Sequence, residues 1–355
     1  MTATNSATPS ASASPAVDFD VARLEEFLRP QLPAFSGALQ VSRCNGGQSN
    51  PTFRLNAGAR RYILRSKPPG KLLSSAHAIE REYRVISALE GSPVPVPRTL
   101  LFCDDLDVIN RSFYLMDCVD GRILGDQTLP DVSRAERGLT YESLVDVMAA
   151  LHRVDYRAIG LADYGKEGDY VARQITRWTR QYRDTETRRV EAMERLMSWL
   201  PENIPPQTDT AIVHGDYRLD NVVLHPTEPR LMAVLDWELS TLGDPLVDFA
   251  HHCITWRLGL GVHRTLAGAD LPALGIPTEA AYLAAYCERT GRSVSQHDWE
   301  FYLALCMFRL AAIQQGILKR TLDGNANNPS RGDAIGKRVE ATSGMAWQIA
   351  ERLAH

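Results

Sequence analysis

The sequence predicts an α+β fold, in which a small antiparallel sheet precedes a larger and mostly helical part. Short β-rich runs separated by turn residues recur through the first third of the 355-residue chain, a pattern typical of antiparallel strands. Helical periodicity dominates from Thr140 onward, and one strand–loop–strand segment interrupts it near His214. We therefore expect a tail over residues 1–17, a first domain over 18–117 and a second domain over 118–355.

The tail and the first helix differ sharply in composition. Residues 1–17 are mostly Ala, Ser, Thr and Pro with no basic residue, and such a segment buries too little apolar surface to become ordered. The lack of arginine also argues against a mitochondrial transit peptide. Asp18 and Asp20 then begin a predicted helix over Val21–Arg29, which Pro30 ends.

The first domain carries the predicted sheet. A turn-rich loop over residues 44–51 joins its first two strands, and a glycine-rich loop of this kind can bring backbone N–H groups close to phosphate oxygens. One main helix is expected between the third and fourth strands, capped by Ser74 or Ser75 and running to about Leu89. The expected strands are Leu39–Val41, Thr52–Leu55, Arg61–Arg65, Leu100–Cys103 and Ser112–Met116.

Helices fill the rest of the second domain. His152 is expected to end the first of them and to satisfy a hydrogen bond in the core. The polar residues Arg309, Gln314, Gln315 and Lys319 recur at helical spacing, so we expect a solvated helix face, with a role in lining an acceptor site as the alternative. The other predicted helical stretches are Asp169–Leu200, Thr278–Thr290, Asp298 to about Arg320, and Gly332–Leu353.

The most informative segment reads His-Gly-Asp-Tyr-Arg-Leu-Asp-Asn over residues 214–221. Apolar runs lead into it and leave it, and a further run at 232–235 ends at Asp236. Asp216, Asn221 and Asp236 are therefore expected at strand ends. Phosphoryl transfer needs such a set, because one carboxylate orients the attacking hydroxyl while an amide oxygen and a second carboxylate hold Mg²⁺ on the phosphates.

These residues resemble the catalytic loop of the aminoglycoside phosphotransferase and choline kinase-like family, which is related to protein kinases. The match comprises His-Gly-Asp, four residues, Asn221, and an apolar strand ending in Asp-Trp-Glu, followed in register by Gly243–Asp248. More narrowly, the chain looks like the kinase-like domain that precedes an acyl-CoA dehydrogenase in some proteins. The resemblance runs from about Leu39 to the C-terminus and implies a protein kinase-like two-lobed fold.

The resemblance implies that the γ-phosphoryl group of ATP, with Mg²⁺, moves to a hydroxyl of a small molecule. Asp216 would accept or orient the acceptor's proton, and Arg218 would place a cation near the γ-phosphate. Asn221 and Asp236 would bind the metal. By the same resemblance, Asp248 would brace the backbone of the catalytic loop. Asp244, which precedes a proline, more simply caps the helix that follows.

The same resemblance assigns nucleotide contacts to the first domain. Arg65 stands where the family usually has lysine and would neutralise phosphate charge, since a guanidinium also grips phosphate. Glu82 would position Arg65, with Glu80 as the second choice. The remaining nucleotide-binding assignments are Asn50, in the turn-rich loop, and Met116, Asp117 and Val119, in the crossover that reads the adenine edge.

Composition limits the other classes of function. A net charge of −4 gives no reason to expect nucleic acid or an anionic membrane as partner. The six cysteines form no CxxC pair, which argues against a zinc site. The sequence shows no signal peptide, so we expect a reducing cytoplasm. No apolar run approaches the roughly twenty residues that span a bilayer. The oligomeric state is not indicated by the sequence.

Several readings of the activity stay open. The acceptor could be a hydroxyacyl-CoA or hydroxy acid, as the dehydrogenase-linked domains suggest, or an aminoglycoside or other small alcohol. A protein kinase is disfavoured because the segment between Asp236 and Asp248 is too short for an activation loop and a peptide platform. The chain could also be a non-catalytic nucleotide-binding module. The arginine at position 65, where the family usually has lysine, supports this alternative. A metallohydrolase would need its ligands His214, Asp216, His251 and His252 to converge, although adjacent helical residues rarely chelate one ion. For His251 and His252 we expect structural roles.

Overall fold

A computed structural model describes residues 17–33, 35–44, 50–69, 79–207, 209–259, 265–324 and 332–354. The described residues form two compact units: an N-terminal unit up to Ser87 together with Pro97–Cys118, and a C-terminal unit of Ala88–Val96 together with Val119 onward. Residues 88–96 thus belong with the second unit, whereas the sequence analysis placed them in the first domain. Residues 1–16, most of the turn-rich loop and the proposed caps Ser74 and Ser75 lie outside the described residues.

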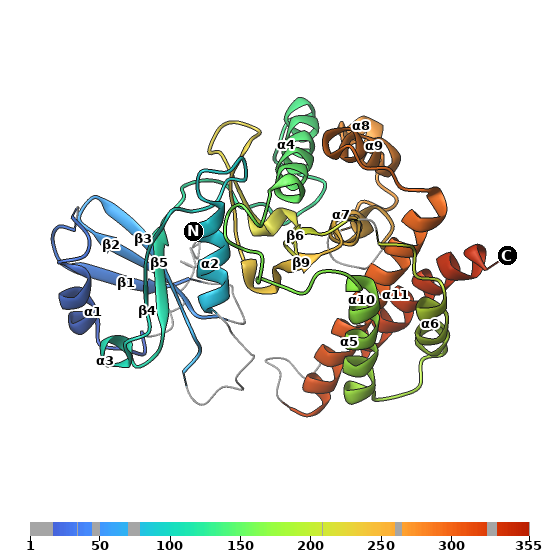
Figure 1. Cartoon of the computed structure of the whole chain (residues 1–355), viewed down its shortest axis with the longest axis horizontal. Coiled ribbons are helices and arrows are strands. Elements are labelled where there is room, and N and C mark those ends of the chain that lie inside the picture. Colours follow the sequence, from blue (N-terminus) through green and yellow to red (C-terminus); the bar gives the residue numbers. More distant parts are fainter. Residues whose placement is uncertain are drawn as a thin grey trace, which may run out of the picture. The chain divides into compact units, whose positions relative to one another are not determined.

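The N-terminal unit contains a five-stranded sheet in the order β1-β2-β3-β5-β4, with every neighbouring pair antiparallel (Figure 1). The helix α1 (Val21–Leu28) begins at Asp20, whose side chain caps two backbone N–H groups, as predicted. The short α3 (Leu106–Ile109) was not predicted. The strands are β1 (Leu39–Arg43), β2 (Thr52–Ala57), β3 (Arg60–Ser66), β4 (Thr99–Cys103) and β5 (Phe113–Asp117), and the main helix is described over α2 (Ile79–Leu89).

One face of this sheet is buried against α1. Phe53, Leu55 and Leu64 are fully buried and pack in one cluster with Leu24 and Leu28 of the helix. Side chains two positions apart in a strand share a face, so the opposite face is left for Arg65, between Leu64 and Ser66 on β3. The alternation of apolar side chains along the strands therefore determines the face of the sheet on which Arg65 lies.

The C-terminal unit is mostly helical, and the predicted α+β class with a sheet-rich first part is confirmed (Figure 1). The predicted stretch Asp169–Leu200 is two helices, because residues 186–190 leave the helical conformation. The first helix begins at Arg134, earlier than expected, since Ser133 caps it. The helices are α4 (Arg134–Arg153), α5 (Tyr170–Thr185), α6 (Glu191–Glu202), α7 (Pro245–Cys253), α8 (Leu271–Leu274), α9 (Glu279–Thr290), α10 (Gln296–Leu322) and α11 (Gly332–Leu353).

The central helix of this unit, α10, is more apolar than the sequence reading expected. By length and composition alone it could cross a membrane, which contradicts the expectation that no run comes close. Of the window that meets this criterion, 83% is buried inside the protein, which is how the core helix of a globular domain also behaves. Arg309 and Gln315 interrupt the apolar pattern of α10 and are themselves buried.

An aromatic cluster joins α7 to α9 and contains a buried histidine. Phe249 stacks on Tyr286 with ring centroids 4.0 Å apart. His252 hydrogen-bonds the carbonyl of Tyr217 at 3.2 Å through Nδ1 and the hydroxyl of Tyr282 at 3.1 Å through Nε2. Burial lowers the pKa of His252 to about 4, since a charged ring is costly in an apolar surrounding. The structural role expected for His252 fits these contacts.

Gly121 lies where the chain enters the helical unit. The next residue, Arg122, exchanges two backbone hydrogen bonds of 2.8 Å with Leu224. A Cβ atom on Gly121 would come within 2.2 Å of the Leu224 carbonyl oxygen and 2.4 Å of a Val223 methyl group. Leu224 ends the strand that follows residues 214–221. The close approach of Gly121 therefore packs the entering chain against the strand next to that segment.

Gly121→Ala should destabilise the protein by about 1–3 kcal/mol, because the backbone must move to relieve the overlap. The matched control is Gly125→Ala, where a Cβ atom meets nothing within 4 Å and the change should stay within about 0.5 kcal/mol. Urea denaturation of the three proteins measures both effects. Equal stability of the two variants would contradict the steric argument.

The free energy of unfolding should fall as the pH drops from about 6.5 to about 4. In that window the unfolded state protonates His252 while the folded state, with its lowered pKa, does not. The shift corresponds to roughly 3 kcal/mol, and His252→Asn should flatten the profile by a similar amount. Denaturation curves at several pH values test this. A wild-type slope in His252→Asn would contradict the prediction.

Candidate active site

Two short antiparallel pairs frame the segment 214–221. The strand β6 (Ala211–Val213) enters it and pairs with β9 (Thr241–Gly243), while β7 (Val222–Leu224) leaves it and pairs with β8 (Leu231–Val234). The predicted order of strand, loop, strand, turn and strand is therefore observed. The strand β9 was missed, because three residues ending in glycine carry too little periodicity to reveal a strand.

A buried carboxylate on α7 holds the loop backbone. Asp248 accepts from the N–H of His214 at 2.7 Å and of Gly215 at 2.8 Å. Its Oδ2 also lies 3.2 Å from His152 Nε2. Burial alone would raise the pKa of Asp248, but the hydrogen bond from His152 and the charges nearby lower it to about 2. Asp248 is thus an ionised anchor, and Asp244 caps α7 by accepting from Leu246 N–H at 2.9 Å.

His214 connects the loop to the segment that carries Asp236. Its buried ring approaches the carbonyl of Leu235 at 2.9 Å through Nε2, and its Nδ1 lies 3.2 Å from the N–H of Asp216. Both contacts are satisfied when the proton is on Nε2. The N–H of Leu235 in turn donates to the carbonyl of Asn221 at 2.8 Å. These backbone contacts bring Asp236, the next residue, beside the loop.

Gly215 and Arg309 complete the support of the loop. Gly215 has φ of +82°, and a Cβ atom there would lie 2.9 Å from the carbonyl oxygen of Leu239, so only glycine fits. Arg309 donates to the Gly215 carbonyl at 2.6 Å. The prediction of a solvated face on α10 is therefore wrong: Arg309 and Gln314 are buried, and Gln315 binds Thr185 and Thr187, while Lys319 is half-buried.

Asp216 has two hydrogen-bond donors on one oxygen and a longer contact at the other. Its Oδ2 accepts from Arg218 Nε at 3.1 Å and from Asn221 Nδ2 at 3.0 Å. Its Oδ1 lies 3.5 Å from Nε2 of His251. Burial would raise the pKa of the carboxyl, but the hydrogen bond from His251 and the charge of Arg218 hold it well below its usual range. The structure thus brings Asp216, Arg218 and Asn221 together, as predicted, and keeps the carboxylate ionised.

His251 is the residue of this cluster that sequence reasoning assigned to a structural role. Burial and the nearby charge of Arg309 lower its pKa, so the ring is neutral. Its Nδ1 is buried and has no hydrogen-bond partner among the described residues, so the proton belongs on Nε2, facing Asp216. A signal was available: Asp248 and His251 are three residues apart and share one face of α7.

The predicted metal ligands have suitable chemistry. Because the Asn221 amide donates its Nδ2 to Asp216, its oxygen is turned away from that carboxylate. Asp236 is half-buried and has φ of 63°, a conformation that aspartate tolerates better than most residues. Mg²⁺ is usually held by one or two carboxylates plus substrate phosphates, so a pair of oxygen ligands fits. The described residues contain no cluster of three or more His, Cys, Asp or Glu able to hold a metal.

The N-terminal unit forms the predicted ion pair. Arg65 on β3 lies with its Nε 3.2 Å from the Glu82 carboxylate on α2, and both side chains are buried. The second choice, Glu80, instead pairs with Lys67. Asn50 is buried two residues before β2 begins. Arginine thus occupies the geometry expected for the family's lysine.

The predicted adenine-edge segment follows β5. Met116 is buried in the sheet, and the Asp117 side chain pairs with Arg98 at 3.0 Å. The N–H of Asp117 is bound to the Arg98 carbonyl, and that of Cys118 to the Arg61 carbonyl. Of the amides in this segment, Val119 N–H is therefore the better candidate for reading a nucleobase.

Comparison with known proteins identifies the family. A model of the phosphotransferase enzyme family matches residues 40–299. Acyl-CoA dehydrogenase family member 10 of Mus musculus is 42% identical over 332 residues, which cover 93% of this chain and 31% of the mouse protein. The chain spans less than half the length of the curated relatives considered, so the match concerns one portion of those proteins.

Solved structures agree with the architecture. A Ralstonia eutropha protein described as a candidate aminoglycoside phosphotransferase is 50% identical, with a TM-score of 0.86 and coverage of 94% of this chain and 99% of that one. An aminoglycoside phosphotransferase variant solved with AMP-PNP and hygromycin B shares the fold at 18% identity and a TM-score of 0.58, covering 91% and 98% of the two chains. The resemblance inferred from His214–Asn221 and Asp236 is confirmed, and the chain belongs to the phosphotransferase enzyme family, with a kinase-like domain of the type found in acyl-CoA dehydrogenase family members 10 and 11.

Proposed function

We propose that this protein transfers the γ-phosphoryl group of ATP to a hydroxyl of a small molecule. The observation that carries the proposal is the ionised Asp216 carboxylate, which three neighbouring donors orient on a loop anchored by Asp248. In such a transfer, Asp216 accepts a hydrogen bond from the acceptor hydroxyl and takes its proton as the bond to phosphorus forms. The leaving group is ADP.

Asn221 and Asp236 would hold Mg²⁺, which neutralises charge on the phosphates when bound. Arg218 reaches Asp216 through Nε, so the rest of its guanidinium is available for a phosphoryl oxygen. In the N-terminal unit, Arg65 would contact phosphate, and Glu82 would hold it in place. ATP as the nucleotide is supported by the AMP-PNP complex of the fold relative.

A small acceptor fits better than a protein substrate. The 3-10 turn Trp237–Leu239, β9 and the start of α7 fill the segment between Asp236 and Asp248. All of these residues are described, and they leave no length for an activation loop. Gly215 also stands where a regulated protein kinase carries an arginine, and its φ and its approach to Leu239 require glycine.

For the acceptor we propose a hydroxyacyl-CoA or a related hydroxy acid, with aminoglycosides as the alternative. The relatives named for acyl-CoA dehydrogenases support the first class, and the Ralstonia and hygromycin proteins support the second. ADP release from ATP and Mg²⁺, measured with hydroxyacyl-CoAs, free hydroxy acids and aminoglycosides, separates them. Signal with an aminoglycoside alone would refute the acyl-CoA assignment, and signal with a protein panel alone would refute the small-molecule assignment.

Asp216→Asn should lower the transfer rate by roughly 10²-fold or more, because the amide cannot accept the acceptor proton. ATP binding should persist, which calorimetry of the variant measures. Asp146→Asn, which removes an equal charge from an exposed pair on α4, should keep wild-type turnover. Near-normal turnover in Asp216→Asn would remove this carboxylate from the mechanism and favour a non-catalytic nucleotide-binding protein.

His251→Leu should lower kcat by about tenfold, because Oδ1 of Asp216 loses the donor that fixes its orientation. His251→Gln can still place an N–H near the same oxygen and should recover most of the rate. Thermal denaturation of both variants checks that the fold persists. Equal loss of activity in the leucine and glutamine variants would mean that His251 fills space and does not position Asp216.

A further inference from the structure

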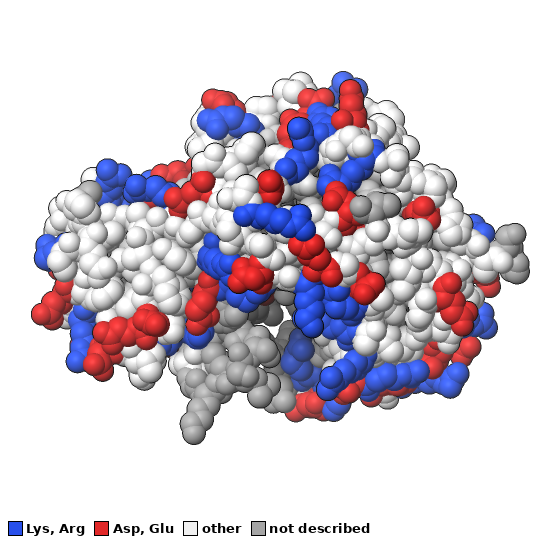
Figure 2. Space-filling view, viewed as in Figure 1, with Lys and Arg blue, Asp and Glu red and all other residues white. Residues whose placement is uncertain are grey.

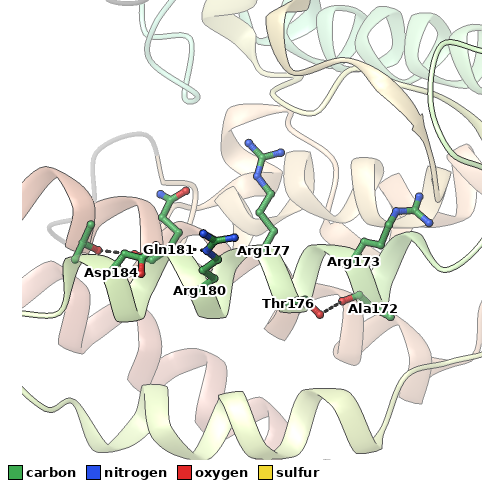
Figure 3. A pocket seen from close by; sticks show the side chains of 8 residues that line it. Ala172, Arg173, Thr176, Arg177, Arg180, Gln181 and Asp184 are labelled. Atoms are coloured by element: carbon green, nitrogen blue, oxygen red, sulfur yellow. Dashed lines mark hydrogen bonds and ion pairs between the residues drawn. The ribbon is translucent and has the colours of Figure 1, made fainter. Parts of the chain in front are cut away.

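A shallow, open groove of about 620 Å³ lies over one face of α5 in the C-terminal unit, and the described residues that line it all belong to this helix. Arg173, Arg177 and Arg180 line it, and they share one helix face because they stand four and three residues apart. Figure 3 shows Arg173, Arg177 and Gln181 projecting from the same side of the helix. In Figure 2, lysine and arginine side chains gather over the area where Figure 1 places α5.

The positive charge of this arginine row is only partly balanced. Asp184 lies 3.7 Å from Arg180, and this exposed pair is a weak one. Within the described ranges of the chain, Arg173 and Arg177 have no carboxylate at ion-pair distance, and Arg173 donates to the backbone carbonyls of Lys166 and Gly168. Like charges at this spacing weaken a helix, so a bound anion would relieve a repulsion built into α5.

The arginine row is connected to the catalytic loop through one aromatic ring. The guanidinium of Arg177 lies 5.3 Å from the centre of the Trp178 ring, and that of Arg309 lies 5.2 Å from the same ring. Arg309 also donates to the carbonyl of Gly215, the residue before Asp216. A ligand in the groove is therefore held by a helix that packs directly against the support of the catalytic carboxylate.

We infer that the arginine row binds phosphate groups of the acceptor, which is then an alcohol attached to a phosphate-bearing carrier such as the nucleotide part of coenzyme A. The assignment of the bound ligand as the phosphoryl acceptor rests on the proposed function. Guanidinium groups match phosphate oxygens in charge and in geometry. A cationic aminoglycoside would need carboxylates in the same place, and three arginines repel it.

Free coenzyme A is the probe, titrated into the full chain by calorimetry without ATP. Arg177→Gln should weaken its binding about tenfold, and wild-type affinity should fall as salt is raised. Arg195→Gln on α6 is the matched control. Arg195 is also an arginine stacked on a tryptophan, 5.4 Å from the ring of Trp347, but it lies outside the groove. Its substitution should leave the affinity unchanged. Dephospho-coenzyme A and pyrophosphate, used as competitors, identify which phosphates are bound.

Absence of coenzyme A binding to the wild type, or equal affinity in wild type and Arg177→Gln, would overturn the inference. The test is independent of turnover. Weakened binding in Arg177→Gln without phosphorylation of any alcohol would refute the proposed function and leave the groove assignment intact. Phosphorylation of a free hydroxy acid with the same KM in both proteins, without coenzyme A binding, would refute the groove assignment and leave the proposed function intact.

Discussion

The site depends on one buried anion, the carboxylate of Asp248. Two backbone N–H groups, those of His214 and Gly215, point into the protein where the chain leaves β6, and without an acceptor each would be a costly buried donor. Asp248 accepts from both, and His152 approaches the same carboxylate from α4. A buried charge is tolerated only when several donors surround it. The loop conformation and the ionised state of Asp248 therefore stabilise each other. Together they set the orientation of Asp216, the next residue of the loop.

This arrangement separates the residues that react from those that hold them. Asp216, Arg218 and Asn221 lie on a loop between two short strand pairs, which could not fix a geometry alone. The supports come from helices: Asp248 and His251 from α7, His152 from α4, and Arg309 from the apolar helix α10. Because most of the apolar window of α10 is buried, the guanidinium of Arg309 reaches the Gly215 carbonyl from a closely packed part of the helix. Sites placed on loops but braced by packed helices keep their reacting groups within the narrow tolerances that phosphoryl transfer needs.

The sequence allowed the reacting residues to be predicted better than their supports. Asp216, Asn221 and Asp236 sit at strand ends with a spacing that chemistry explains, and Arg65 and Glu82 pair as the resemblance implied. Arg309 was placed on a solvated face because a charged residue in a helix usually is solvated, and only a contact across 94 residues of sequence shows otherwise. The position of His251 beside Asp216 was missed for a different reason: its neighbour His252 suggested a metal pair, and rejecting that pair left only a general structural role for both histidines. The strand β9 was too short to carry a pattern.

The contacts of Asp216 also limit the kind of base it can be. Two donors occupy Oδ2, and the long contact from neutral His251 leaves room on Oδ1, so the acceptor hydroxyl would approach Oδ1. A carboxyl whose pKa lies well below its usual range is a weak base and would draw little charge from the hydroxyl before the phosphoryl group departs. A weak base is compatible with phosphoryl transfer, because the transition state is loose. The acceptor hydroxyl then loses its proton only late in the reaction. On the proposed function, the cluster therefore contributes through orientation of the hydroxyl and of the phosphates, and its rigidity matters more than the basicity of Asp216.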